Sequence, residues 1–359
     1  MNNSFLFIKG AEFCDVRMQK YLKYFKQNQI PYLCWGWLRK DTIKPLDSNN
    51  IYYLLKGGGY ASNKLIVYYL VWMVVLFFRA LFSRKIKSYN IVAVNFDSAL
   101  PVFFASIIRR FSYSYEILDE FSLSYNFPAP IRFFTQKIDH LIMHHAKVVI
   151  HVDVNRITYK NCKYIVIENS PYDFYNGQEK DYSKVTHSFV VSGYLSPIRC
   201  VESILHFAEL HPNINFIIAG EILDNSLTTP IKSLPNVVYY NFMPQDKLFE
   251  LIQNCAGIFS LYRPNIQINR LAASNKVYDA MMLGIPVITN PEVINSSFIL
   301  ENKIGLTINA DYDETWDKLV SPTFLHDAEI LGRNGRHLYL ERYVFDKMIK
   351  DIFIPAVCQ

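Results

Sequence analysis

Short apolar runs alternate with amphipathic stretches along the whole chain, and this alternation predicts β-strands separated by α-helices. A strand followed by a helix and a second strand implies a parallel sheet. In the first half, the runs expected to form strands are 4–8, 32–37, 51–55, 90–95, 113–118, 147–151 and 163–168. The pattern then restarts, with expected strands at 188–192, 215–219, 237–240, 257–261, 287–288 and 305–308.

The amphipathic stretches place helices between these strands, at 15–27, 100–111, 197–210, 244–254, 274–284, 325–339 and 345–353. A polar stretch, 175–184, separates the two halves, and 359 residues are many for one hydrophobic core. We therefore expect an α/β protein with an N-terminal domain at 1–175, a second domain at 185–340 and a C-terminal segment at 341–359.

Composition narrows the class of protein. Apolar residues make up 51% of the chain and charged residues 19%, which excludes disorder. The net charge of +5 suits phosphorylated ligands or anionic membranes, and no dense basic run favours nucleic acid. The six cysteines are scattered without a Cys-x-x-Cys pair, and the apolar stretch at 4–8 is too short for a signal peptide. We expect a cytoplasmic protein.

An unusually apolar run, L-I-V-Y-Y-L-V-W-M-V-V-L-F-F, occupies residues 65–78. Its fourteen residues are few for a bilayer crossing, and strands of the expected sheet flank it on both sides, so a spanning helix is disfavoured. Two interpretations remain about equal: a helix buried in the first domain, and a helix lying against a membrane. In the second, Trp72 lies at the membrane surface, and Arg79, Arg84 and Lys85 meet lipid phosphates.

The stretch with the clearest chemistry is 274–288, S-N-K-V-Y-D-A-M-M-L-G-I-P-V-I. It predicts a helix that a polar residue, Ser274 or Asn275, caps at its start, so that free backbone N–H groups and the positive end of the helix dipole attract phosphate. Lys276 adds a full positive charge there. Asp279, one turn later, offers a carboxylate to sugar hydroxyls. The alternative is an ordinary helix of a parallel sheet with a solvated lysine.

This run resembles the nucleotide-sugar signature of the family 4 glycosyltransferases, whose members often read P-N-K-[L/V]-[F/Y]-E-[Y/A]-M-x-x-G-x-P-V-I. Asp279 stands where that family usually has glutamate. The resemblance implies a GT-B fold, in which two Rossmann-like domains with parallel sheets face each other across a cleft. It further implies that the second domain binds the donor and that the final helix returns to the first domain.

Further donor contacts follow from the same resemblance. Gly193 matches a glycine that lets a diphosphate approach after the first strand of the donor domain, and Arg199 is the best candidate for the nearby basic residue. The family's first glutamate of a Glu-x7-Glu pair falls on Leu271, so Arg263 and Arg270 are candidate polar substitutes on that loop.

Candidates in the first domain are fewer. Gly10 is the single glycine after the first expected strand and is a candidate donor contact. Because G-x-G-x-x-G is absent, we expect no NAD. Asp119 and Glu120 follow another strand, at the edge where open α/β sheets bind ligands, and join Arg199 and Lys276 as catalytic candidates. Leu118 stands where the family often has histidine. His140 and His144 have the spacing of a zinc pair, yet we expect solvated histidines and no metal.

The function that the resemblance implies is metal-independent sugar transfer from a nucleotide-sugar to an acceptor, with retention of anomeric configuration. The apolar run and its basic flank favour a lipid-linked glycan acceptor, as in bacterial capsule, O-antigen or exopolysaccharide synthesis, with peripheral association at the inner face of the cell membrane. Two alternatives stay open: a nucleotide-sugar epimerase of similar architecture, and a non-catalytic membrane-associated protein that keeps the fold.

Overall fold

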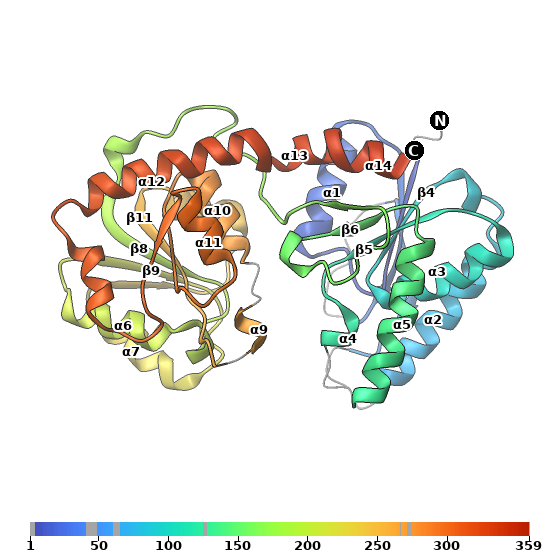
Figure 1. Ribbon diagram of the computed structural model, residues 1–359, viewed down its shortest axis with the longest axis horizontal. Coiled ribbons are helices and arrows are strands. Elements are labelled where there is room, and N and C mark those ends of the chain that lie inside the picture. Colours follow the sequence, from blue (N-terminus) through green and yellow to red (C-terminus); the bar gives the residue numbers. More distant parts are fainter. Residues whose placement is uncertain are drawn as a thin grey trace. The chain divides into compact units, whose positions relative to one another are not determined.

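Two compact units, each built on its own parallel sheet, make up the chain (Figure 1). Unit 1 comprises Met1–Glu168 and Asp346–Gln359, and unit 2 comprises Asn169–Phe345. The computed structural model describes residues 4–40, 49–59, 65–124, 128–265, 267–270 and 274–358. The expected α/β class with two parallel sheets is confirmed. Leu271 lies outside the described residues.

The sheet of unit 1 has seven strands in the order β3-β2-β1-β4-β5-β6-β7, all parallel. The strand order reverses between β1 and β4, which creates a topological switch point. The strands are β1 (Phe5–Lys9), β2 (Tyr32–Leu38), β3 (Ile51–Lys56), β4 (Asn90–Val94), β5 (Tyr113–Ile117), β6 (Val149–His151) and β7 (Tyr164–Val166).

Right-handed crossovers place the helices of unit 1 on opposite faces of this sheet, because β1 to β2 runs one way along the sheet and β3 to β4 to β5 to β6 runs the other. Alternate side chains of β1 follow the same division. Phe7 packs against Phe25 of α1 and Phe353, whereas Leu6 and Ile8 belong to the cluster under α2 and α3. The helices are α1 (Val16–Gln27), α2 (Leu65–Phe82), α3 (Phe96–Arg109), α4 (Phe121–Ser124) and α5 (Ala129–His145).

The apolar run forms helix α2, which is longer than its fourteen apolar residues suggested. One stripe of it is buried: Trp72, Leu76 and Ala80 are inaccessible to solvent and pack onto the sheet. The prediction that Trp72 lies at a membrane surface is therefore wrong, because its indole fills the core. The opposite face is exposed, so the helix is not buried as a whole either. By length and composition α2 is the one helix in the described part of the chain that is suited to cross a membrane.

Unit 2 has six parallel strands in the order β10-β9-β8-β11-β12-β13, with a second switch point between β8 and β11. The strands are β8 (Thr186–Ser192), β9 (Asn215–Ala219), β10 (Val237–Tyr240), β11 (Cys255–Ser260), β12 (Val287–Thr289) and β13 (Gly305–Thr307). The helices are α6 (Val201–Leu210), α7 (Thr228–Ser233), α8 (Gln245–Ile252), α9 (Gln267–Arg270), α10 (Asn275–Leu283), α11 (Asn295–Glu301) and α12 (Phe324–Leu338).

The segment that joins the two halves of the sequence belongs to unit 2. Arg336 of α12 pairs with both carboxylate oxygens of Asp173, at 2.6 and 3.0 Å. The Tyr339 hydroxyl donates to the Pro171 carbonyl, and the Lys180 ammonium donates to the Gly284 carbonyl at the end of α10. These contacts tie residues 171–180 to unit 2, and the first part of unit 1 ends at Glu168, before the expected 175.

The end of the chain is helical but irregular. After α12 the backbone continues through π-helical turns at Tyr339–Tyr343 and Ile349–Phe353, which flank α13 (Phe345–Met348) and precede α14 (Ile354–Cys358). This C-terminal segment packs in unit 1: Phe353 contacts Phe5 and Phe7, and the Lys147 ammonium donates to the Val357 carbonyl. The second boundary lies at 345/346, close to the expected 341.

Candidate functional site

The switch point of unit 2 brings together loops that are far apart in the sequence. Strands β8 and β11 are neighbours, yet β8 leads toward β9 on one side and β11 leads toward β12 on the other. The loops that leave them start at Gly193 and Leu261 and diverge at the carboxyl edge of the sheet. In open α/β sheets this divergence leaves a crevice for ligands.

Helix α10 points its N-terminus at the same edge. Ser274 is the N-cap, and its hydroxyl oxygen accepts a hydrogen bond from the Lys276 backbone N–H at 3.3 Å. The helix ends at Gly284, which adopts a left-handed conformation with φ +61°. Both ends of the helix are therefore as the sequence predicted. Asn275 is exposed in the first turn and does not cap it.

The Lys276 side chain reaches the loop after β8. Its Nζ lies 3.6 Å from the point where a β-carbon on Gly193 would stand. Burial lowers the pKa of Lys276, and the Arg199 cation lowers it further, whereas Tyr262 and Asp279 act in the opposite direction. Two predicted donor residues are thus close together, and the Lys276 cation stands beside the backbone of Gly193, which no side chain covers.

Two glycines keep this loop open. Gly193 has φ +98°, a conformation that L side chains rarely adopt. Gly220, at the end of β9, has φ +149°, and a β-carbon there would overlap the Gly193 carbonyl. The loops after β8 and β9 therefore lie directly on each other, and a substituted residue would separate them.

Arg199 stacks on Tyr262 at the same edge. The helix expected at 197–210 is broken: a 3-10 turn, Pro197–Arg199, ends at Cys200, whose left-handed φ of +56° precedes α6. The guanidinium carbon of Arg199 then lies 4.1 Å from the centre of the Tyr262 ring. Its Nη1 atom is shielded from solvent and has no hydrogen-bond partner among the described residues.

Tyr262 is a member of this site that the sequence did not single out. The Asn290 side chain fixes its backbone by bonding to both its N–H and its carbonyl. Burial alone would raise the pKa of Tyr262, yet the Lys276 and Arg199 cations, with hydrogen bonds from Ser274 and Arg199, bring that pKa below its ordinary value. The Tyr262 phenol thus lies in a positive local potential that Lys276 and Arg199 create.

Asp279 also has a partner that the sequence did not reveal. The Gln245 amide, at the start of α8, donates to the Asp279 carboxylate at 3.1 Å. This carboxylate and amide lie one helical turn beyond Lys276. A cationic, glycine-lined edge next to an acceptor and amide pair can hold an anion and fix a hydroxylated ring beside it.

The other two arginines predicted on the donor side have protein partners. Arg263 forms ion pairs with Glu202, at 3.4 Å, and with Asp311. Arg270 donates from Nε to the Pro264 carbonyl at 2.9 Å. These three contacts hold the loop after β11 in place, so the structure gives these arginines a role in shaping that loop.

In unit 1, Asp119 and Glu120 follow β5 at the carboxyl edge, as expected. Arg156 pairs with Asp119 at 2.9 Å. Hydroxyl groups of Ser122 and Thr158 donate to the two carboxylate oxygens of Glu120, each at 2.9 Å. These contacts orient both acids while most of the Asp119 side chain stays exposed.

Gly10 follows β1 at the switch point of unit 1, and packing explains why it is glycine. A β-carbon there would overlap the Asp97 carboxylate, and Arg39 donates from Nε to the Gly10 carbonyl at 2.8 Å. Burial raises the pKa of Asp97 to about 6 against the lowering effect of Arg39 and Lys9. A donor contact at Gly10 stays a prediction.

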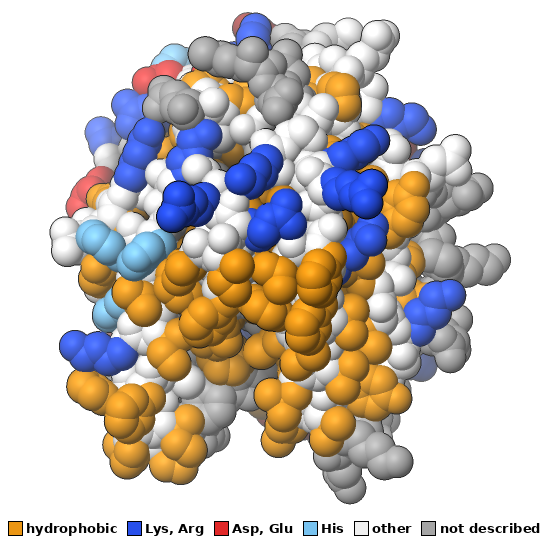
Figure 2. Space-filling model, turned by 90° about the vertical axis from the view of Figure 1, so that its right-hand side faces the viewer, with side chains coloured by type: hydrophobic (Ala, Val, Ile, Leu, Met, Phe, Trp, Pro, Cys, Tyr) orange, Lys and Arg blue, Asp and Glu red, His pale blue; other side chains and the backbone are white. Residues whose placement is uncertain are grey.

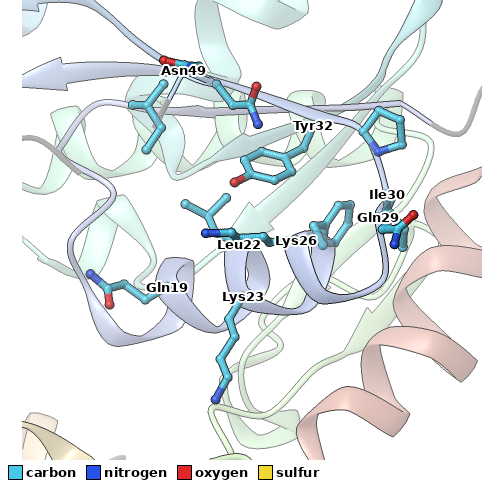
Figure 3. A pocket seen from close by; sticks show the side chains of 12 residues that line it. Gln19, Leu22, Lys23, Lys26, Gln29, Ile30, Tyr32 and Asn49 are labelled. Carbon is cyan, nitrogen blue, oxygen red and sulfur yellow. The ribbon is translucent and has the colours of Figure 1, made fainter. Parts of the chain in front are cut away.

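A cavity of about 630 Å³ in unit 1 lies elsewhere (Figure 3). Side chains of α1 line it, including Leu22 and Lys26, together with residues where β2 and β3 begin, including Tyr32 and Asn49. It therefore opens at the amino edge of the sheet, opposite to Gly10 and Asp119, and none of the predicted site residues lines it.

No group of three or more His, Cys, Asp or Glu side chains is arranged to hold a metal ion within the described ranges. The histidines with zinc-like spacing have other neighbours. The His140 ring stacks on Tyr159 with centroids 4.4 Å apart, and Nδ1 of His144 lies 3.3 Å from the Asn161 carbonyl.

Comparison with solved structures identifies the fold as GT-B. HepE from Anabaena, solved in complex with UDP, is similar over 99% of this chain and 100% of its own, with a TM-score of 0.68 at 13% identity. WaaG, a glycosyltransferase involved in lipopolysaccharide biosynthesis, matches with a TM-score of 0.61 at 10% identity, over 96% of this chain and 97% of its own.

Epimerases share the same architecture. The UDP-GlcNAc 2-epimerase from Methanocaldococcus jannaschii matches over 95% of this chain and 99% of its own, with a TM-score of 0.55 at 13% identity. No family profile and no curated protein matches the sequence. The chain therefore shares its fold with a glycosyltransferase, an epimerase and a protein solved with UDP, and identities this low establish the fold alone.

Proposed function

We propose that this protein is a glycosyltransferase that takes its sugar from a nucleotide-sugar donor bound by unit 2. The observation that carries the proposal is the convergence of Lys276, Arg199 and the N-terminus of α10 on the glycine-lined switch point. A diphosphate placed there would meet two cations and the positive end of the α10 dipole. HepE, which shares this fold, was solved in complex with UDP, and this supports a nucleoside diphosphate as the ligand.

The chemistry follows from these charges. In sugar transfer the bond between the anomeric carbon and the diphosphate oxygen breaks, an acceptor oxygen bonds to that carbon, and the acceptor proton is released. Negative charge grows on the departing diphosphate, and Lys276, Arg199 and the α10 dipole stabilise it without a metal ion. Asp279, held by Gln245, accepts hydrogen bonds from donor hydroxyls. Retention of anomeric configuration follows from the resemblance to family 4.

For the acceptor, we propose a lipid-linked glycan of a bacterial surface polysaccharide, used at the cytoplasmic face of the membrane. Asp119 and Glu120 are the acids of unit 1 that we assign to the acceptor hydroxyl, since partner side chains orient both at the carboxyl edge. The role of WaaG in lipopolysaccharide biosynthesis and the exposed apolar face of α2 favour this acceptor class.

An epimerase is the second candidate, because UDP-GlcNAc 2-epimerases share the fold. Both classes need the donor site of unit 2, so the product decides between them. Incubation with a panel of UDP-, GDP- and dTDP-sugars and a membrane extract should release nucleoside diphosphate together with a glycosylated lipid. An isomerised sugar nucleotide would support epimerisation, and binding without any reaction would support a non-catalytic role.

The donor site is tested by substituting Lys276. Lys276→Ala should weaken UDP binding by about tenfold to a hundredfold, the usual range for a lost hydrogen bond to a charged group. Lys247→Ala is the matched control, because this exposed lysine pairs with Glu250 on α8 and lies on no predicted site. Equal UDP affinity in Lys276→Ala and the parent, measured by calorimetry, would contradict the proposed position of the diphosphate.

A further inference from the structure

One side of unit 1 exposes apolar side chains on three neighbouring helices. Helix α2 packs along α3, and α3 packs along α5. Their outward residues form what we call the three-helix face, which Figure 2 shows as a broad orange field. Its apolar members are Ile66, Val67, Leu70, Val71, Val74, Phe78 and Phe82 of α2, Phe104, Ile107 and Ile108 of α3, and Ile131, Phe133, Phe134, Ile138 and Leu141 of α5.

These side chains are strongly exposed. Ile66 and Phe82, at opposite ends of α2, are 74% and 73% accessible, and Phe134 on α5 is 65% accessible. The Phe78 and Phe82 rings stack on each other, with centroids 6.1 Å apart, rather than turning into the core. Isolated apolar residues on a surface need no explanation, but a contiguous field of this kind marks an interaction surface.

Positive charge borders this field. Helices α2, α3 and α5 each connect two parallel strands, so they run in the same direction and their C-terminal ends lie at one edge of the sheet. Basic residues follow each helix or close it: Arg84 and Lys85 after α2, Arg109 and Arg110 at the end of α3, and Lys147 after α5. Figure 2 shows lysine and arginine side chains as a band along one border of the apolar field.

Exposed negative charge is absent from these segments. In the stretches 65–111 and 128–145, the carboxylates are Asp97 and Asp139, and both are buried. Apolar side chains bordered by cations, with no exposed carboxylate among them, complement the acyl chains and phosphates of an anionic lipid surface. An anionic membrane presents phosphates over its whole surface, so it can meet the basic band wherever the apolar field inserts. A protein partner would need acidic residues placed opposite the band and apolar residues opposite the field.

We propose that the three-helix face docks on the surface of an anionic membrane, with its apolar field in the interfacial layer and the basic band against lipid phosphates. Helix α2 lies in the interface and does not cross the bilayer, because its Trp72, Leu76 and Ala80 stripe is part of the unit 1 core. The sequence indicated only α2 and its flank, and the fold adds α3 and α5. This proposal is independent of the donor site of unit 2.

Flotation of the purified full chain with lipid vesicles tests the surface. Binding should be strong to vesicles of phosphatidylcholine with phosphatidylglycerol, weak to phosphatidylcholine alone, and should decrease with salt. Arg84→Gln with Lys85→Gln should weaken binding about fivefold for each charge. Lys26→Gln with Lys232→Gln removes the same charge from the exposed ends of α1 and α7 and should change binding little.

The apolar contribution is tested separately with exposed residues whose loss leaves the core intact. Phe82→Ser and Phe134→Ser should each reduce vesicle binding, whereas Phe242→Ser, a phenylalanine of unit 2 that is 81% exposed, should not. Circular dichroism and UDP binding should stay as in the parent, which separates loss of docking from loss of fold or of the donor site.

Three results would overturn the proposal. One is equal binding of the parent and the variants to anionic vesicles. The second is a stable dimer that forms through Phe82 and Phe134 without vesicle binding, which would make a second copy the occupant of the face. The third is resistance of the protein to alkaline carbonate extraction from cell membranes, which would show that α2 spans the bilayer.

Discussion

The Lys276 ammonium lies 3.6 Å from the position that a β-carbon would occupy on Gly193, so the first turn of α10 meets the loop after β8. Because residue 193 is glycine, the Lys276 cation faces backbone that no side chain covers. A diphosphate could approach there and contact both the cation and the Gly193 backbone. The contact exists because β8 and β11 are neighbours in the sheet while the chain between them runs through β9 and β10.

Substitution of Gly193 separates backbone strain from loss of ligand space. Gly193→Ala should destabilise unit 2 by about 1 kcal/mol, because alanine is strained at a φ of +98°. Gly177→Ala is the matched control, since Gly177 has φ +85° and open space around it. Both variants should lose similar stability in thermal unfolding, but only Gly193→Ala should lose UDP affinity. Equal UDP affinity in the two variants would mean that no phosphate approaches Gly193.

The pH dependence of UDP binding should follow Tyr262 and Lys276. The pKa of each is below its ordinary value. Rising pH therefore turns Tyr262 into an anion that competes with UDP for the cations, and it removes the positive charge of Lys276. UDP affinity should therefore fall toward alkaline pH, because the site loses positive charge and gains a negative one. In Tyr262→Phe this fall should be shallower, as measured by calorimetry in a series of buffers. An identical profile in both proteins would show that Tyr262 does not titrate beside the ligand.

A buried ion pair in unit 1 gives a prediction about stability. Arg17 donates from Nε to Glu116 at 2.7 Å, the Tyr21 hydroxyl donates to the same oxygen at 3.1 Å, and Glu116 is fully buried. Arg17→Met leaves that carboxylate without its cation and should cost about 3 to 5 kcal/mol. Hydrogen exchange of the β4 and β5 amides in urea measures this for unit 1 alone.

The double variant is the control for that pair. Arg17→Met with Glu116→Gln removes both charges while Tyr21 keeps an acceptor, so most of the lost stability should return. An exposed pair such as Lys247 with Glu250 should contribute less than about 1 kcal/mol by comparison. A double variant as unstable as Arg17→Met would assign the cost to packing rather than to charge.

Asp139 should make unit 1 less stable as pH rises. Burial raises its pKa to about 7, against a lowering hydrogen bond from the Tyr115 hydroxyl at 2.9 Å and with a further raising effect of Glu120. A group whose pKa is higher in the folded state stabilises fully below its unfolded pKa of 3.8 and loses that contribution up to pH 7. The slope is about 1.4 kcal/mol per pH unit at most.

Asp139→Asn should remove this part of the pH dependence and be more stable than the parent at neutral pH, since Tyr115 can still donate to the amide oxygen. Stability of the two proteins across the range, followed by hydrogen exchange of β5, checks the sign. A parent that gains stability between pH 4 and 7 relative to Asp139→Asn would show that the carboxylate is charged in the fold.

The sequence by itself determined the two parallel sheets, the order of their strands along the chain and the caps of α10. These features depend on local patterns: the period of apolar residues, a serine before a helix and a glycine after it. Lys276 could be predicted as a donor residue for the same reason, since its charge lies in the first turn of a helix that the sequence defines.

Only the tertiary structure decided which residues meet. Tyr262 under Arg199, Gly220 against Gly193 and Gln245 on Asp279 join loops from different strands, and no local pattern encodes such a meeting. The same limit explains why Trp72 was wrongly predicted to lie at a membrane surface. In the sequence, Trp72 cannot be told apart from its exposed apolar neighbours on α2. It is buried because the sheet covers its side of the helix. The handedness of the crossover decides which side that is, and the residue itself does not.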